Sequence, residues 1–216
     1  MASCLFIAAL SGLLLGWWWP PAAAYFRRRY PTYPDLPSLA WQPWEPVCGM
    51  AVGMLLAIWL PNGGLSAWAA WGFAVTVILS ARIDLACGVL AYRFSAGLAA
   101  GGWALQWWFG TGPDAMLASG LTAAALGMIA WLSHGGMGRG DVWFAAGIAG
   151  WFSLTEAWAF LCLAFGGGAL VGIGWLVLGG RNRRAALPFG PFLAWAGITV
   201  MWFAERMGGW YEYIFE

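Results

Sequence analysis

The stretch Ala115–Phe144, AMLASGLTAAALGMIAWLSHGGMGRGDVWF, joins an apolar segment to a glycine-rich loop and then to an aspartate, Asp141. No charged residue interrupts it from 115 to 133, which is long enough for a helix that crosses a bilayer. Another apolar segment begins directly after Asp141. Because an ionisable group at membrane depth is costly, Asp141 is the first candidate functional residue of the chain.

The composition of the whole chain indicates a polytopic membrane protein. It has 216 residues, of which 62% are hydrophobic and 9% charged, well below the charged fraction of soluble domains. The net charge of +1 gives no general field for nucleic acid, so we expect no nucleic-acid partner. Cys4, Cys48, Cys87 and Cys162 form no CxxC pair, and His134 has no neighbouring metal ligand, so no metal site is expected.

Turn-forming residues divide the chain into eight apolar segments, which predict an all-α protein with about eight transmembrane helices. The chain is expected to form one membrane domain, 1–216, with a proline-, tyrosine- and arginine-rich surface loop at 20–46. The apolar segments lie at about 2–19, 46–60, 65–81, 94–109, 115–133, 142–155, 157–178 and 188–204.

The arginines orient this arrangement, because loops on the cytoplasmic side of a membrane protein are rich in arginine and lysine. With eight crossings, all of the arginines except Arg206 fall on one side, which we therefore assign to the cytoplasm. Both termini are then outside. Asp84 and Asp141 are separated by two crossings, so they share the cytoplasmic face. The arginines on that side are Arg27, Arg28, Arg29, Arg82, Arg93, Arg139, Arg181, Arg183 and Arg184.

Two neighbouring carboxyls in a poorly solvated place cannot both ionise easily, so one stays neutral. The charged member can take a proton from a water that attacks a peptide carbonyl, while the neutral member donates a hydrogen bond to the carbonyl oxygen. This chemistry needs no metal or other cofactor. The competing interpretation is structural: an aspartate after a glycine and before a helix is an ordinary helix cap.

Glycines in the loop before Asp141 favour a role for that loop in binding substrate. Gly135, Gly136, Gly138 and Gly140 are expected to permit unusual backbone angles and close approach. An extended substrate segment could then lie beside the loop and pair with its backbone.

Three motifs in order resemble those of the type IV prepilin peptidases, the A24 family of membrane aspartyl proteases. Gly138-Arg139-Gly140-Asp141 is a GxGD motif, Asp84 stands upstream, and LPFGPFLA follows at Leu187–Ala194. The resemblance covers roughly residues 50–205, the membrane core of that family.

The resemblance implies a protease of a type IV pilus or secretion system, in the cytoplasmic membrane of a bacterium or archaeon. Asp84 and Asp141 would be catalytic, and the substrate would be a prepilin or pseudopilin leader segment, cut on the cytoplasmic side. Arg139 is also explained as an interfacial anchor, and the prolines as residues that set the angle at which a helix starts. The residues implied to contact the substrate are Gly138, Arg139, Gly140, Pro188, Phe189, Gly190 and Pro191.

Other features separate this chain from the long members of the family. Trp143 stands where the family usually has a lysine, and the loop at 20–46 lacks the paired cysteines of the family's zinc domain. The resemblance therefore does not extend to the N-methyltransferase activity of the long members.

Two alternative functions remain. Presenilin-like and signal-peptide-peptidase-like proteases also use GxGD, but pair it with tyrosine-aspartate, whereas Ile83 precedes Asp84. A non-enzymatic membrane scaffold or small proton-coupled transporter would use the aspartates as caps or as a proton relay. The sequence indicates neither the particular prepilin nor the oligomeric state.

Overall fold

The computed structural model describes residues 65–88, 90, 92–134, 136–177 and 188–215, and they are all-helical. The α-helical class is thus confirmed for this part of the chain. The expected segments at 2–19 and 46–60 and the loop at 20–46 lie outside the described residues. The described helices are α3 (Leu65–Cys87), α4 (Tyr92–Trp108), α5 (Gly112–Leu132), α6 (Arg139–Ala149), α7 (Leu154–Val177) and α8 (Gly190–Phe215).

The chain divides into two compact units, and α3 contributes to both. The first unit contains Met1–Thr76 and Ala86–Gly88, and the second contains Val77–Leu85 and Val89–Glu216. Asp84, Asp141 and the start of α8 all belong to the second unit, so the candidate site can be described within it.

The boundaries of α4, α5 and α7 agree with the sequence prediction within about three residues. Two helices continue past their predicted ends, α3 to Cys87 instead of 81 and α8 to Phe215 instead of 204, so Asp84 lies in the last turn of α3 and not after it.

The prediction also fails around α6. Asp141 was expected directly before a helix over 142–155, but α6 begins at Arg139 and ends at Ala149, so the aspartate lies in its first turn. The predicted extension to 155 is wrong because a capping pair starts α7 there. The Ser153 N–H donates to Glu156 Oε2 at 2.7 Å, and the Glu156 N–H approaches Ser153 Oγ at 3.5 Å.

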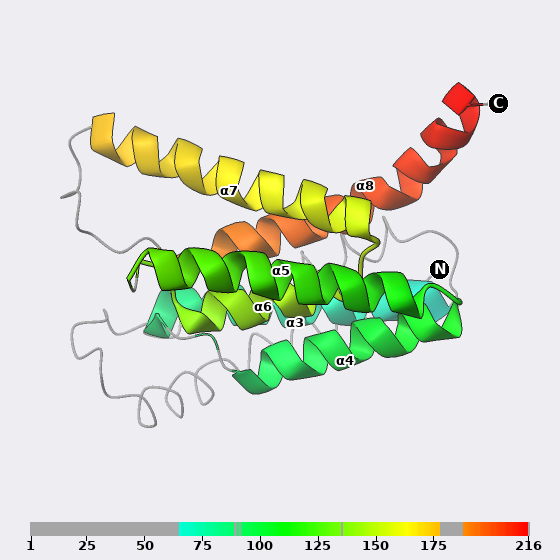
Figure 1. The fold of residues 1–216 in the computed structure, drawn as a ribbon, viewed down its shortest axis with the longest axis horizontal. Coiled ribbons are helices and arrows are strands. Elements are labelled where there is room, and N and C mark those ends of the chain that lie inside the picture. Colours follow the sequence, from blue (N-terminus) through cyan, green and yellow to red (C-terminus); the bar gives the residue numbers. More distant parts are fainter. Residues whose placement is uncertain (1–64, 89, 91, 135, 178–187, 216) are drawn as a thin grey trace, which may run out of the picture. The chain divides into compact units, whose positions relative to one another are not determined.

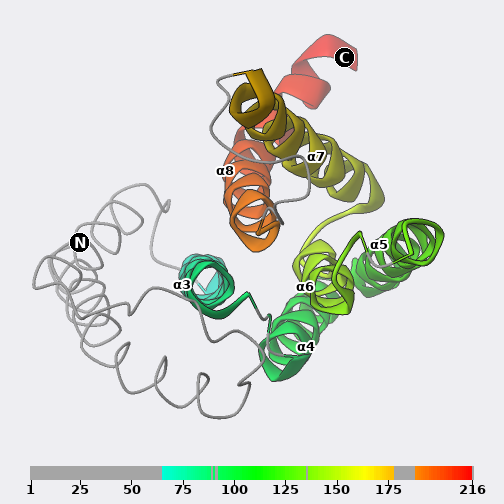
Figure 2. The same cartoon turned by 90° about the vertical axis from the view of Figure 1, so that its left-hand side faces the viewer.

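The short helix α6 is the centre of the second unit. It lies between α4 and α5 and also contacts α7 and α8, while α7 and α8 pair with each other (Figures 1 and 2). Its side chains Phe144, Ala145, Ile148 and Ala149 are at most 1% exposed. Asp141 is therefore attached to the most enclosed helix of this unit.

Small residues allow α4 and α6 to approach closely, as is common between membrane helices. A Cβ atom on Gly147 would lie 2.7 Å from the backbone oxygen of Ser95, and one on Gly102 would lie 2.5 Å from the oxygen of Gly150. Neither position has room for a side chain unless the backbone moves.

Hydrogen bonds and contacts fix the direction of these helices. Gly140 at the start of α6 lies beside Leu90, and Trp151 beyond its end accepts a 2.7 Å hydrogen bond from Gln106 Nε2. Because Leu90 precedes α4 and Gln106 lies near its end, α4 and α6 run in the same direction. Ser119 Oγ on α5 donates to the Ala146 oxygen at 2.7 Å, which joins α5 to the pair.

The outer surfaces of the helices suit a bilayer. Among the described residues, Gly112–Leu132 and Leu154–Gly174 are long and apolar enough to cross a membrane, and Gly190–Phe203 is a shorter apolar helix. Large apolar side chains such as Trp131, Leu170 and Val177 are more than 70% exposed, which water would disfavour and lipid would not. The eight-span count and the outside position of the termini stay predictions.

Candidate active site

Asp84 occupies the last turn of α3 and is only 6% exposed. Its Oδ2 atom accepts a 2.9 Å hydrogen bond from the backbone N–H of Gly190, the first residue of α8. Asp84 and the PFGPF stretch, Pro188–Phe192, are far apart in the sequence but in direct contact in the structure.

Asp141 is the third residue of α6, and its side chain is partly exposed. The N–H of Gly138, which precedes the helix, donates to Asp141 Oδ2 at 3.2 Å. The capping interaction that competed with a catalytic role is thus present. It is a single, long hydrogen bond, and Asp141 Oδ1 has no hydrogen-bond partner among the described residues.

The carboxyls of Asp84 and Asp141 interact electrostatically. Both lie outside the described helices that are long and apolar enough to cross a membrane. Burial raises the pKa of Asp141 to about 6, the negative charge of Asp84 adds to this rise, and the Gly138 hydrogen bond opposes it. Burial also raises the pKa of Asp84, and the Gly190 hydrogen bond opposes that rise. The structure thus places two carboxyls of unusually high proton affinity within range of each other.

Of the loop glycines, Gly135 lies outside the described residues, and Gly136, Gly138 and Gly140 do not have the positive φ angles that favour glycine. Gly138 has φ −69° and ψ 140°, an extended conformation open to any residue, and Gly140 is helical. Gly140 instead allows close approach, because a Cβ atom there would lie 3.1 Å from Leu90 Cβ. Arg139 is exposed and forms no ion pair with a described residue.

The PFGPF residues have different surroundings from one another. Gly190 is buried against Asp84, whereas the Phe189 ring packs on Phe165 of α7 with 5.1 Å between ring centroids. Pro188 lies before α8 and Pro191 in its first turn, and both are partly exposed. Two of the residues expected to contact substrate lie against an aspartate: Gly138 against Asp141, and Gly190 against Asp84. A third, Phe189, packs on α7 instead.

Comparison with curated sequences finds similarity to leader peptidases. The Leader peptidase HopD of Escherichia coli is 44% identical over 69 residues, which are 31% of this chain and 44% of HopD. The Prepilin leader peptidase/N-methyltransferase of Legionella pneumophila is 32% identical over 75 residues, or 35% of this chain and 26% of that protein. Over these stretches the chain is similar to proteins named as leader peptidases of prepilins.

The similarity to prepilin leader peptidases covers part of each protein. The Burkholderia pseudomallei (strain 1026b) enzyme is 28% identical over 172 residues, which are 73% of this chain and 54% of that protein. The chain thus spans about half or less of the length of these relatives. No protein-family model matches the chain, and no solved structure matches it.

Close to Asp141, sequence reasoning missed an aromatic contact. Trp143 and Tyr92 meet edge to face, with ring centroids 5.8 Å apart, and both are about half exposed. The two rings meet because α4 and α6 begin close together in the fold, which the sequence does not reveal. His134 has φ 49°, and its Nδ1–H donates to the Leu132 oxygen at 2.8 Å.

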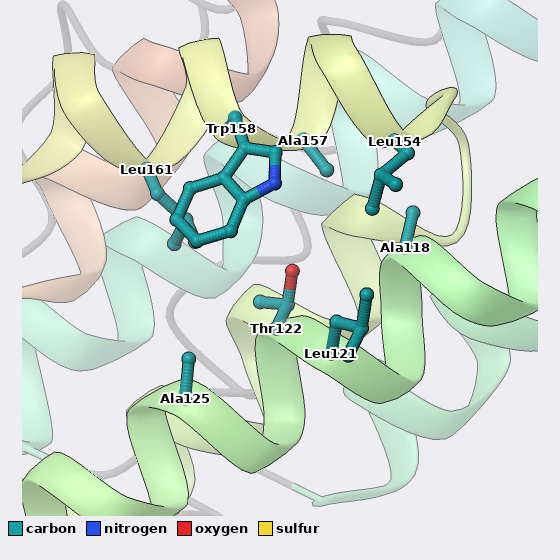
Figure 3. A pocket seen from close by; sticks show the side chains of 8 residues that line it. All are labelled: Ala118, Leu121, Thr122, Ala125, Leu154, Ala157, Trp158 and Leu161. Atoms are coloured by element: carbon teal, nitrogen blue, oxygen red, sulfur yellow. The ribbon is translucent and has the colours of Figure 1, made fainter.

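The described residues also contain a small apolar hollow between α5 and α7 (Figure 3). Its lining includes no carboxyl, so it contributes no reactive group to the aspartate pair. The lining residues are Ala118, Leu121, Thr122, Ala125, Leu154, Ala157, Trp158 and Leu161.

Proposed function

We propose that this protein is a membrane aspartyl endopeptidase that removes the leader peptide of type IV prepilin-like substrates at the cytoplasmic face. The observation that carries the proposal is the electrostatic coupling of Asp84 and Asp141, which lie on different helices. The names of the relatives support the substrate class. Its location would be the cytoplasmic membrane, crossed several times.

The aspartate pair suits hydrolysis by an activated water. One carboxyl is charged and takes a proton as the water oxygen attacks the scissile carbonyl carbon, and the neutral carboxyl protonates the carbonyl oxygen. As the C–N bond breaks, the first carboxyl passes its proton to the leaving amine, and the second recovers its proton from the diol. The pair then holds one proton again, so the cycle needs no other cofactor.

The site has an open side for a substrate. Gly138 and Arg139 at the start of α6 are exposed, and Asp141 itself is partly exposed beside them. An extended leader segment could lie against this edge and reach the carboxyls while the pilin's apolar helix stays in the bilayer. The roles of these residues in substrate contact belong to the proposal.

The proposal is tested with the purified protein in liposomes and a prepilin-like substrate that carries its leader, with mass spectrometry of the products. The resemblance implies a cut after a glycine near the start of the pilin's hydrophobic helix. We therefore expect one cut, after that glycine, and no cut when the glycine is replaced by a bulky residue. An intact substrate with folded protein would contradict the proposal. Preferential cutting of remnant signal peptides would favour a presenilin-like enzyme, and proton flux without any cut would favour a transporter.

A further inference from the structure

The contact between Gly190 and Asp84 leaves no room for a side chain. A Cβ atom on Gly190 would lie 2.6 Å from Asp84 Oδ2 and 2.9 Å from Asp84 Cβ. The glycine N–H can therefore reach the carboxylate because no Cβ stands between the start of α8 and the end of α3.

The Gly190 N–H is available for this bond because of its position in α8. The Phe189 oxygen accepts hydrogen bonds from the N–H groups of Phe192 and Leu193 at 3.1 and 3.2 Å, so Phe189 caps the helix and Gly190 is its first residue. First-turn N–H groups have no partner within the helix, and the positive end of the helix favours a negative charge. A carboxylate at this point is stabilised in its ionised form.

Phe189 holds the start of α8 in place from the other side. Its ring packs on Phe165, and the nearest ring atom lies 3.1 Å from where a Cβ atom of Gly168 would be. Phe165 and Gly168 both belong to α7. The aromatic residue of the motif thus anchors the backbone on α7, and the glycine that follows meets Asp84.

The hydrogen bonds to the two aspartates are unequal. The one from Gly190 to Asp84 measures 2.9 Å, whereas the one from Gly138 to Asp141 measures 3.2 Å. The shorter bond stabilises a charge more, and a charge on Asp84 disfavours a second charge on Asp141. Of the two carboxyls, Asp141 is therefore the one that carries the proton, and Asp84 is the ionised one.

Building on the proposed function, we propose that Gly190 is a positioning residue whose N–H keeps Asp84 ionised as the proton acceptor for water, while Asp141 carries the pair's proton. Asp84 then gains the proton of the attacking water, and Asp141 gives its own to the carbonyl oxygen. As the C–N bond breaks, Asp84 protonates the leaving amine and Asp141 takes its proton back from the diol.

The sharpest test replaces the Gly190 amide by an ester, with glycolic acid at this position, because the N–H is lost and no bulk is added. We expect the acidic limb of the pH profile of kcat to move upward by about one pH unit, since a hydrogen bond to a charged group is lost. KM should stay within about twofold, because the Gly190 N–H donates to Asp84 and is not available to the substrate. An equal loss of kcat at every pH, with no movement of the limb, would overturn the proposal.

Gly190→Ala keeps the N–H but pushes the Asp84 carboxylate away, so kcat should fall by about tenfold or more at every pH. Gly166→Ala on α7 is the matched control, since nothing lies within 4 Å of its Cβ position, and it should cut like the parent. If Gly190→Ala also cuts like the parent, the close approach has no role in positioning Asp84.

A readout independent of cleavage separates this inference from the proposed function. The carboxyl carbons of the four aspartates, Asp35, Asp84, Asp114 and Asp141, can be labelled with ¹³C and followed by NMR against pH. We expect Asp84 to titrate at lower pH than Asp141, and its midpoint to rise in the ester variant. Asp84 titrating after Asp141 would refute the inference even if prepilins are cut. The expected order without any cut would uphold the placing of the proton on Asp141 and refute the proposed function.

Discussion

Asp84→Asn and Asp141→Asn should each lower the rate of leader removal by on the order of 10²–10⁴-fold, the usual contribution of a positioned acid or base. The amide oxygen of asparagine can still accept the Gly190 or Gly138 N–H, so the helix contacts should survive. Because the two carboxyls act together in the same step, the double variant should be little worse than either single one. Leader removal is measured by mass spectrometry under single-turnover conditions.

Asp114→Asn is the matched control for this pair. Asp114 lies exposed in the first turn of α5, and its replacement should leave cleavage within about twofold of the parent, as expected for a surface change. The catalytic role fails if both Asp84→Asn and Asp141→Asn cut as well as the parent. It fails equally if Asp114→Asn is the variant that loses activity.

The second large effect concerns the packing of α4 against α6. Gly147→Ala places a methyl group 2.7 Å from the Ser95 backbone oxygen, so the helices must separate, and overpacking of this kind costs about 1–3 kcal/mol. Because α6 carries Asp141, cleavage should fall along with stability. Thermal unfolding in detergent measures the change.

Gly97→Ala on α4 is the control for that substitution, because nothing lies within 4 Å of its Cβ position. Alanine is the better helix former, so this variant should match the parent or be slightly more stable. Equal melting temperatures for Gly147→Ala and the parent would show that α4 and α6 are not held as closely as the structure indicates.

The helical class of the described residues and the placement of the two aspartates at the same end of the helices could be predicted from sequence. Long uncharged segments fix the class, because a bilayer leaves little choice beyond helices. The alternation of segments placed Asp84 and Asp141 at the same end, and the coupling of their charges agrees with that placement. Their catalytic roles remain proposals.

The local details could not be predicted, because they depend on contacts between distant segments. The early end of α6 follows from the capping pair at Ser153 and Glu156, a signal that was present in the sequence but was outweighed by hydrophobicity. The Gly190–Asp84 bond and the packing of Phe189 on Phe165 connect different helices, and no local pattern encodes them.

The central claim is that Asp84 and Asp141 act as one electrostatic unit, and the pH titration of the Asp141 carboxyl tests it most directly. In the parent, ¹³C NMR should show Asp141 titrating at a pKa of about 6. In Asp84→Asn the repelling charge is gone, so the pKa should fall toward the ordinary 3.8 while burial keeps it above that value. An Asp141 pKa that is unchanged by Asp84→Asn would show that the two carboxyls do not interact and would contradict the account.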